Sequence, residues 1–73
     1  MWIRSQNRMQ LQDVNRFVIE QFEIGTYIVG NGCTLGIYST KEKALRVLDG
    51  IQNQIEYKKV EVHQMPQDED VEV

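Results

Sequence analysis

The residues best suited to chemistry lie in the first sixteen positions, where one tryptophan stands among three arginines. The set consists of Trp2, Arg4, Arg8 and Arg16, interspersed with the side-chain amides of Gln6, Asn7 and Gln10. Arginine offers a planar fork for phosphate or carboxylate, and tryptophan offers a face for stacking. Side-chain amides can read the edge of a base. We therefore take Trp2, Arg4, Arg8 and Arg16 as the candidate ligand-binding or partner-binding residues, which in a dimer could line a shared groove.

The same residues also have a purely structural interpretation. We favour this interpretation, because an arginine excess of this size occurs by chance on many protein surfaces. Trp2 would then be part of the core and would anchor the N-terminus, contributing about 2–3 kcal/mol if fully buried. The arginines would be solvated, or paired with the carboxylates of Asp13, Glu20 and Glu23. The two interpretations differ in where they place the indole ring.

Catalysis and metal binding have little support in the sequence. Cys33 is the only cysteine and His63 the only histidine, so a nucleophile and base would require these two residues to meet in space. A lone cysteine is more often an inert, small apolar residue. The acidic C-terminus lacks the glycine and spaced carbonyl ligands of a calcium loop. We expect no catalytic residue, no metal and no cofactor, and an exposed His63 next to Glu61.

The length and cysteine content indicate a small domain that needs additional support. A chain of 73 residues buries only a modest core, and a single cysteine cannot form an internal disulfide. Oligomerisation is the remaining common remedy, so we expect a homodimer or higher oligomer. The unpaired thiol fits a reducing compartment, and no apolar run is long enough for a signal peptide or a membrane span. These features predict a cytoplasmic protein without membrane contact.

Charge is distributed unevenly along the chain, whose net charge is −3. Four of the eleven acidic residues follow Pro66, so the eight basic residues of the rest face seven acidic ones. A nearly neutral body argues against non-specific binding to nucleic acid, which needs a clustered positive surface. We expect one domain over residues 1–66 and a disordered acidic tail over 67–73. An alternative role for the tail is to imitate the phosphates of nucleic acid.

The segment STKEKALRVLDGIQNQI predicts an amphipathic helix over about residues 40–55. The apolar stripe consists of Ala44, Leu48, Ile51 and Ile55, widened by Leu45 and Val47. Ser39 and Glu42 fit a capping box, and Thr40 is the alternative cap. Gly50 costs roughly 1 kcal/mol inside a helix. It would allow close approach of a sheet or a second subunit, or it is tolerated without such a role.

A hairpin is expected before this helix. Asn31 and Gly32 separate two apolar runs, and both residues tolerate the positive φ angles of a two-residue hairpin turn. Tyr27–Gly30 should therefore pair antiparallel with Thr34–Tyr38. The same argument explains the glycines of GNGCTLG without a phosphate-binding loop, which would lie between a strand and a helix.

Further strands complete the predicted sheet. They are expected at Met1–Ser5, Leu11–Val14 and Phe17–Gln21, with a turn at Gly25. A final strand at about 59–65 ends at Pro66, with Val60 and Val62 on one face and Glu61 and His63 on the other. The sequence thus predicts an α+β fold: a small, curved antiparallel sheet of about five strands with one helix on one face. A dimer could form edge to edge, or through the helix stripe with Leu45.

The sequence resembles a group of short proteins from phages, prophages and mobile regions of Gram-positive bacteria. The resemblance rests on the start MWIRSQN, on LGIYSTKEKALRVLDGIQ and on HQMP, and it covers most of residues 1–66. It implies an accessory or inhibitor protein that binds a host enzyme or a defence component, or that sequesters a signalling nucleotide. We therefore expect a non-enzymatic protein-binding function, with capture of a small anionic nucleotide by Arg4 and its neighbours as the alternative.

Overall fold

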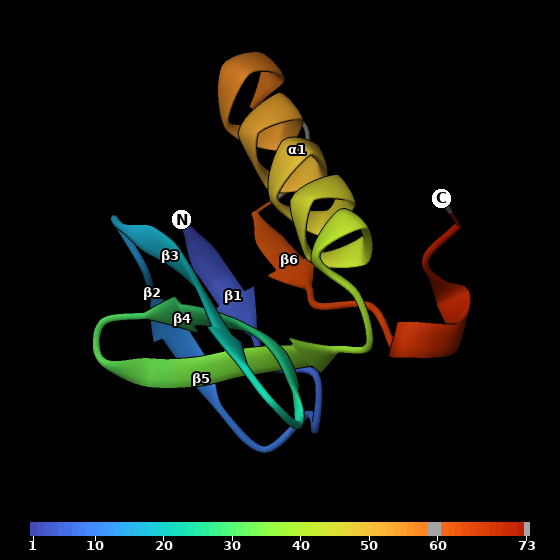
Figure 1. Cartoon of the computed structure of the whole chain (residues 1–73). Coiled ribbons are helices and arrows are strands. Elements are labelled where there is room, and N and C mark those ends of the chain that lie inside the picture. The colour runs from blue at the N-terminus through green and yellow to red at the C-terminus, as the bar shows by residue number, and fades with distance from the viewer. Residues whose placement is uncertain (59–60, 73) are drawn as a thin grey trace.

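Strands come first along the chain, followed by one long helix and a last strand, as the sequence predicts (Figure 1). The computed structural model describes residues 1–58 and 61–72. Its elements are β1 (Trp2–Arg4), β2 (Leu11–Asp13), β3 (Phe17–Phe22), β4 (Gly25–Gly30), β5 (Cys33–Tyr38), α1 (Lys41–Tyr57), β6 (Val62–Gln64) and the 3-10 helix η1 (Asp68–Asp70). The α+β class is confirmed. Residues 59 and 60, at the start of the expected last strand, lie outside the described residues.

The strands form two small sheets, and the prediction of one antiparallel sheet is wrong in this respect. Sheet A has the order β2-β1-β6 and sheet B the order β3-β4-β5. The chain bends at Asn15, between β2 and β3, while Val14 turns into the core. β6 pairs with β1 in parallel. The end of α1 lies beside Met1 and Trp2, so β6 starts at the end of sheet A where β1 also starts.

The hairpin of β4 and β5 has the predicted pairing and turn. Asn31 and Gly32 have φ angles of 52° and 78°, and the strands pair from Gly30 and Cys33 to Thr26 and Tyr38. A β-bulge interrupts the register next to Ile28. The turn forms as expected because these two residues adopt positive φ at low cost.

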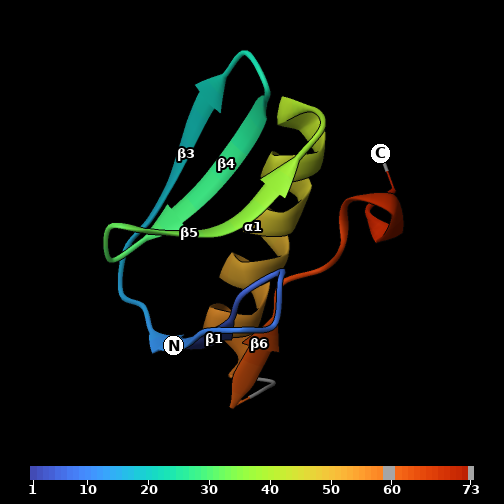
Figure 2. The same cartoon turned by 90° about the horizontal axis from the view of Figure 1, so that it is seen from below.

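The helix α1 packs against sheet B and reaches sheet A through its last turns, where Gln54 meets His63 (Figure 2). Its inner face buries Ala44, Val47 and Ile51, whereas Leu45 and Ile55 of the predicted stripe are exposed. The other buried apolar residues are Ile3, Val14, Ile28, Leu35, Tyr38, Met65 and Val71. The core therefore draws on both sheets, the helix and the C-terminal segment.

The helix begins one residue later than predicted and has the alternative cap. The side chain of Thr40 accepts a hydrogen bond from the backbone N–H of Lys43 at 3.1 Å. Ser39 is not the cap, because its hydroxyl and backbone N–H both donate to Asp68. At the other end Lys58 adopts a left-handed conformation, and its N–H bonds to the carbonyl of Gln54.

The C-terminal segment packs against the rest of the chain over residues 67–72, where the sequence predicts a disordered tail. η1 lies in this segment, and Val71 is buried in the core. The hydroxyl of Tyr38 donates to the carbonyl of Pro66 at 2.9 Å, and Lys43 forms an ion pair with Asp68 at 3.5 Å. These contacts could not be predicted from the acidic composition of the segment, which is typical of a disordered tail. Val73 lies outside the described residues.

The N-terminal strand forms as predicted but presents the opposite face. β1 is the central strand of sheet A, and Ile3 is fully buried while Trp2 is half exposed. The expectation that Trp2 belongs to the core is therefore wrong. Alternation along a strand sends neighbouring side chains to opposite faces, so burial of Ile3 turns the indole outward.

Candidate protein-binding surface

Trp2 and Arg4 lie together on the outer face of sheet A. The register pairs Trp2 with Asp13 on β2 and with Val62 on β6, and it pairs Arg4 with Leu11 and Gln64. Paired residues of neighbouring strands point to the same side of a sheet. We call this surface the Trp2 face, which consists of Trp2, Arg4, Leu11, Asp13, Val62 and Gln64.

The Trp2 face exposes three large apolar side chains. The exposed fractions are 47 % for Trp2, 55 % for Leu11 and 47 % for Val62. Trp2 also borders a hollow beside Ile55 and Lys58, where the end of α1 approaches sheet A. Contiguous apolar side chains at a surface mark sites of association more often than isolated ones do. This face is therefore the strongest candidate for binding among the predicted residues.

The arginines of the set are only partly brought together. The Nε of Arg4 donates to the backbone carbonyl of Arg8 at 3.0 Å, so these two residues are neighbours. Arg16 instead lies directly before β3 and lines a hollow on sheet B with Val18 and Val29. The structure thus places Trp2 and Arg4 on one face, brings the backbone of Arg8 to Arg4, and separates Arg16 from the Trp2 face.

Two of the three amides expected to read a base edge, those of Gln6 and Asn7, have structural roles. Gln6 bonds the outer edge of β5: its Nε2 donates to the carbonyl of Ile37 at 3.0 Å, and its Oε1 accepts from the N–H of Ile37 at 2.9 Å. Asn7 accepts a hydrogen bond from the hydroxyl of the buried Ser5. These bonds fix the turn between β1 and β2, in which Arg8 has a φ of 68°. They position Arg8 next to Arg4.

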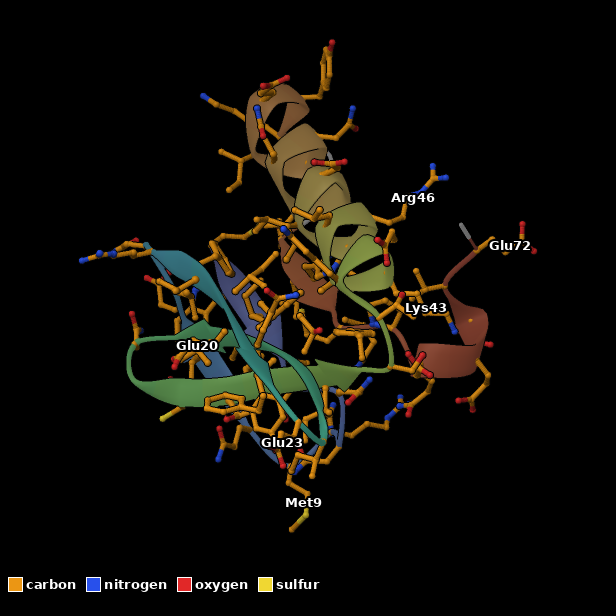
Figure 3. All side chains as sticks on the ribbon, viewed as in Figure 1. Met9, Glu20, Glu23, Lys43, Arg46 and Glu72 are labelled. Atoms are coloured by element: carbon orange, nitrogen blue, oxygen red, sulfur yellow. The ribbon has the colours of Figure 1, made fainter. Side chains whose placement is uncertain are left out.

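A cleft that the sequence analysis missed lies between α1 and the C-terminal segment. It has a volume of about 440 Å³, and it is lined by Arg46, Val47, Gly50, His63, Pro66, Asp70, Val71 and Glu72. Arg46 projects from the helix on the side where Glu72 lies (Figure 3). This cleft was not predicted, because the tail that forms one of its walls was expected to be disordered. Val71, an apolar residue among carboxylates, was the available signal.

His63 forms part of the floor of this cleft and faces inward, contrary to the prediction of an exposed residue. Its Nδ1 lies 2.6 Å from the Oε1 of Gln54, and its Nε2 is buried without a hydrogen-bond partner among the described residues. Burial lowers the pKa of His63 below its ordinary value because the charged ring loses water. Val62, by contrast, points outward next to Trp2.

Cys33 and His63 lie in different sheets. Cys33 opens β5 in sheet B, whereas His63 belongs to β6 in sheet A and pairs with Gln54. Within residues 1–58 and 61–72, no group of three or more His, Cys, Asp or Glu residues is arranged to hold a metal ion. The same part of the chain contains no helix of the length and apolarity needed to span a membrane.

Comparison with protein-family models, with curated proteins and with solved structures found no match to this chain.

Proposed function

We propose that the chain is a small, non-enzymatic binding protein that engages another protein through the Trp2 face. The observation that carries the proposal is the exposed apolar group of Trp2, Leu11 and Val62 with Arg4 beside it. Tryptophan and arginine are enriched at the centres of protein interfaces, where they contribute most of the binding energy. We propose as the target a host enzyme or a defence component, which is what the resemblance to phage-borne proteins implies.

The charges on the Trp2 face indicate the chemistry of the target surface. The carboxylate of Asp13 already pairs with the N-terminal ammonium group at 2.9 Å. Arg4 remains as the cation beside the apolar side chains. The matching surface of the target therefore carries apolar groups and a carboxylate, which complements Arg4.

Affinity capture with matched variants tests this proposal. The tagged chain is used to capture proteins from the bacterium that carries its gene, next to Trp2→Ser and Ile24→Ser variants. Ile24 is the matched control, because it is an apolar side chain that is 82 % exposed and lies at the tip of the β3–β4 hairpin, outside the Trp2 face. The proposal predicts a captured protein that is lost with Trp2→Ser and retained with Ile24→Ser. A protein retained equally by both variants contradicts it, once circular dichroism shows that both variants fold.

Sequestration of a small anionic nucleotide is the second candidate, supported by the contact between the Arg4 side chain and the backbone of Arg8. A ligand that binds only the folded chain raises its melting temperature. This alternative predicts a rise with nucleotides that Arg4→Ala together with Arg8→Ala abolishes. Binding of a protein through the Trp2 face predicts no rise with nucleotides.

A further inference from the structure

The outer edge of β3 is open, whereas the other edge of sheet B is covered. Residue Gln6 lies along β5 and bonds it from both its backbone and its side chain: the N–H of Gln6 donates to the carbonyl of Leu35 at 2.7 Å. β3 is the end strand on the opposite side, and no element of the described chain pairs with its outer edge (Figure 2). It spans six residues, FVIEQF, without the proline or lysine that protects many edges.

Alternate residues of β3 direct their backbone groups to this open edge. Phe22 and Gly25 flank the two-residue turn of the β3–β4 hairpin, so they form a hydrogen-bonded pair. Even-numbered residues of β3 then bond to β4, and residues 17, 19 and 21 point their N–H and C=O groups outward. Within the described residues, these outward groups have no hydrogen bond. Backbone groups of this kind are ready to pair with another strand.

The sequence around Val18 is complementary to itself. In the stretch RFVIE, a cation lies two residues before Val18 and an anion two residues after it. Val18 and Glu20 are exposed on the outer face of the sheet, whereas Phe17 and Ile19 pack against the core. When two such strands run antiparallel about Val18, Arg16 of each copy meets Glu20 of the other.

Other central registers are less favourable. A two-fold axis perpendicular to the sheet keeps the core sides of both copies on one side, and it can lie at Val18, Ile19 or Glu20. The axis at Glu20 brings two carboxylates face to face. The axis at Ile19 places Glu20 opposite the apolar Val18. Only the axis at Val18 joins opposite charges twice and places Val18 against its own copy.

We propose that two copies of the chain pair antiparallel along β3, with the two-fold axis at Val18 and Arg16 opposite Glu20 of the second copy. The two copies of sheet B then form one continuous six-stranded sheet. This pairing removes the open edge and extends the core, because Phe17 and Ile19 of the two copies lie side by side. The pairing is independent of the proposed function, since the Trp2 face belongs to sheet A.

Charge reversal tests the predicted contact. The wild-type chain should sediment at twice its chain mass of 8.6 kDa at tens of micromolar. Arg16→Glu or Glu20→Arg alone should give monomers, because each places like charges opposite each other. The double variant, and an equimolar mixture of the two single variants, should restore the dimer. A monomeric wild type, or a failure of both restorations, overturns the proposal. Trp2→Ser should leave the dimer unchanged.

A cysteine scan tests the register in the Cys33→Ser background. Val18 forms a non-hydrogen-bonded pair at the axis, and pairs of this kind bring Cβ atoms closest. Val18→Cys should therefore form a disulfide-linked dimer in air, whereas Glu20→Cys should not. A disulfide at position 20 without one at position 18 contradicts the register, and the absence of a link at both positions contradicts the pairing. Circular dichroism of each variant establishes that the fold is retained.

Discussion

Asp68 accepts hydrogen bonds from the backbone N–H and the hydroxyl of Ser39, at 2.8 and 3.2 Å. These bonds join the C-terminal segment to the residue that precedes the helix cap. Lys43, one turn into α1, also donates to the backbone carbonyl of Asp68 at 3.0 Å. As a result Val71 reaches the core, and the segment becomes one wall of the cleft.

Removal of this carboxylate should loosen the segment. In Asp68→Ala, the N–H of Val71, which bonds to the carbonyl of residue 68 at 3.3 Å, should exchange faster with solvent. Amide hydrogen exchange by NMR measures the change. Glu69→Ala is the matched control, because Glu69 is the exposed carboxylate next to it. Equal exchange in the two variants would show that the Ser39 contact does not hold the segment.

The stability of the fold should depend on pH through His63. Burial lowers its pKa below the ordinary 6.5, so the unfolded chain binds a proton at a pH where the folded chain does not. The free energy of unfolding should therefore fall as the pH drops below 6.5, until the folded chain is protonated as well. Urea unfolding between neutral pH and about pH 5, where most carboxylates stay ionised, measures the effect. His63→Gln should remove most of this slope, and an unchanged slope would contradict the assignment.

Two glycines should respond oppositely to alanine. A Cβ at Gly30 would lie 2.6 Å from Cγ1 of Val14 and 2.8 Å from Cδ1 of Leu35, so Gly30→Ala should destabilise the fold by about 1–3 kcal/mol. A Cβ at Gly50 would meet nothing within 4 Å, so Gly50→Ala should stabilise the helix by about 1 kcal/mol. Denaturant unfolding gives both values. Destabilisation by Gly50→Ala would show that the chain needs a glycine there.

Alanine variants distinguish the two possible helix caps. Thr40→Ala removes the acceptor for the N–H of Lys43 and should cost about 1 kcal/mol. Ser39→Ala keeps the backbone bond to Asp68 and loses only the hydroxyl bond, so its cost should be smaller. The free energy of unfolding of each variant decides the order. A larger loss with Ser39→Ala would restore the capping-box interpretation.

The elements that could be predicted are those determined by local chemistry. Asn31 and Gly32 encode their turn through the positive φ angles that they tolerate, and the spacing of Ala44 and Ile51 defines the inner face of α1. Three-residue strands carry no comparable signal, because two or three alternating residues do not show which strand is the partner. The division into two sheets and the parallel pairing of β1 with β6 therefore could not be predicted.

The candidate site was predictable only in part: Trp2 and Arg4 share a face as expected, Arg16 lies apart from them on sheet B, and the orientation of the face was not predictable. Trp2 and Arg4 share a face because they are two residues apart in a strand. Whether this face is the buried one depends on the tertiary packing of Ile3, which competes with Trp2 for the core. For the same reason His63 faces inward and Val62 is exposed, whereas the sequence predicts an exposed His63. A valine is placed outside here because it pairs with the exposed Trp2.

Fluorine NMR of the fluorotryptophan-labelled chain shows whether Trp2 contacts a protein partner. Trp2 is the only tryptophan, so the spectrum contains one resonance from the folded chain. Addition of the captured partner should shift or broaden this resonance in proportion to the bound fraction. A resonance that keeps its position and width while the partner is fully bound would contradict the claim.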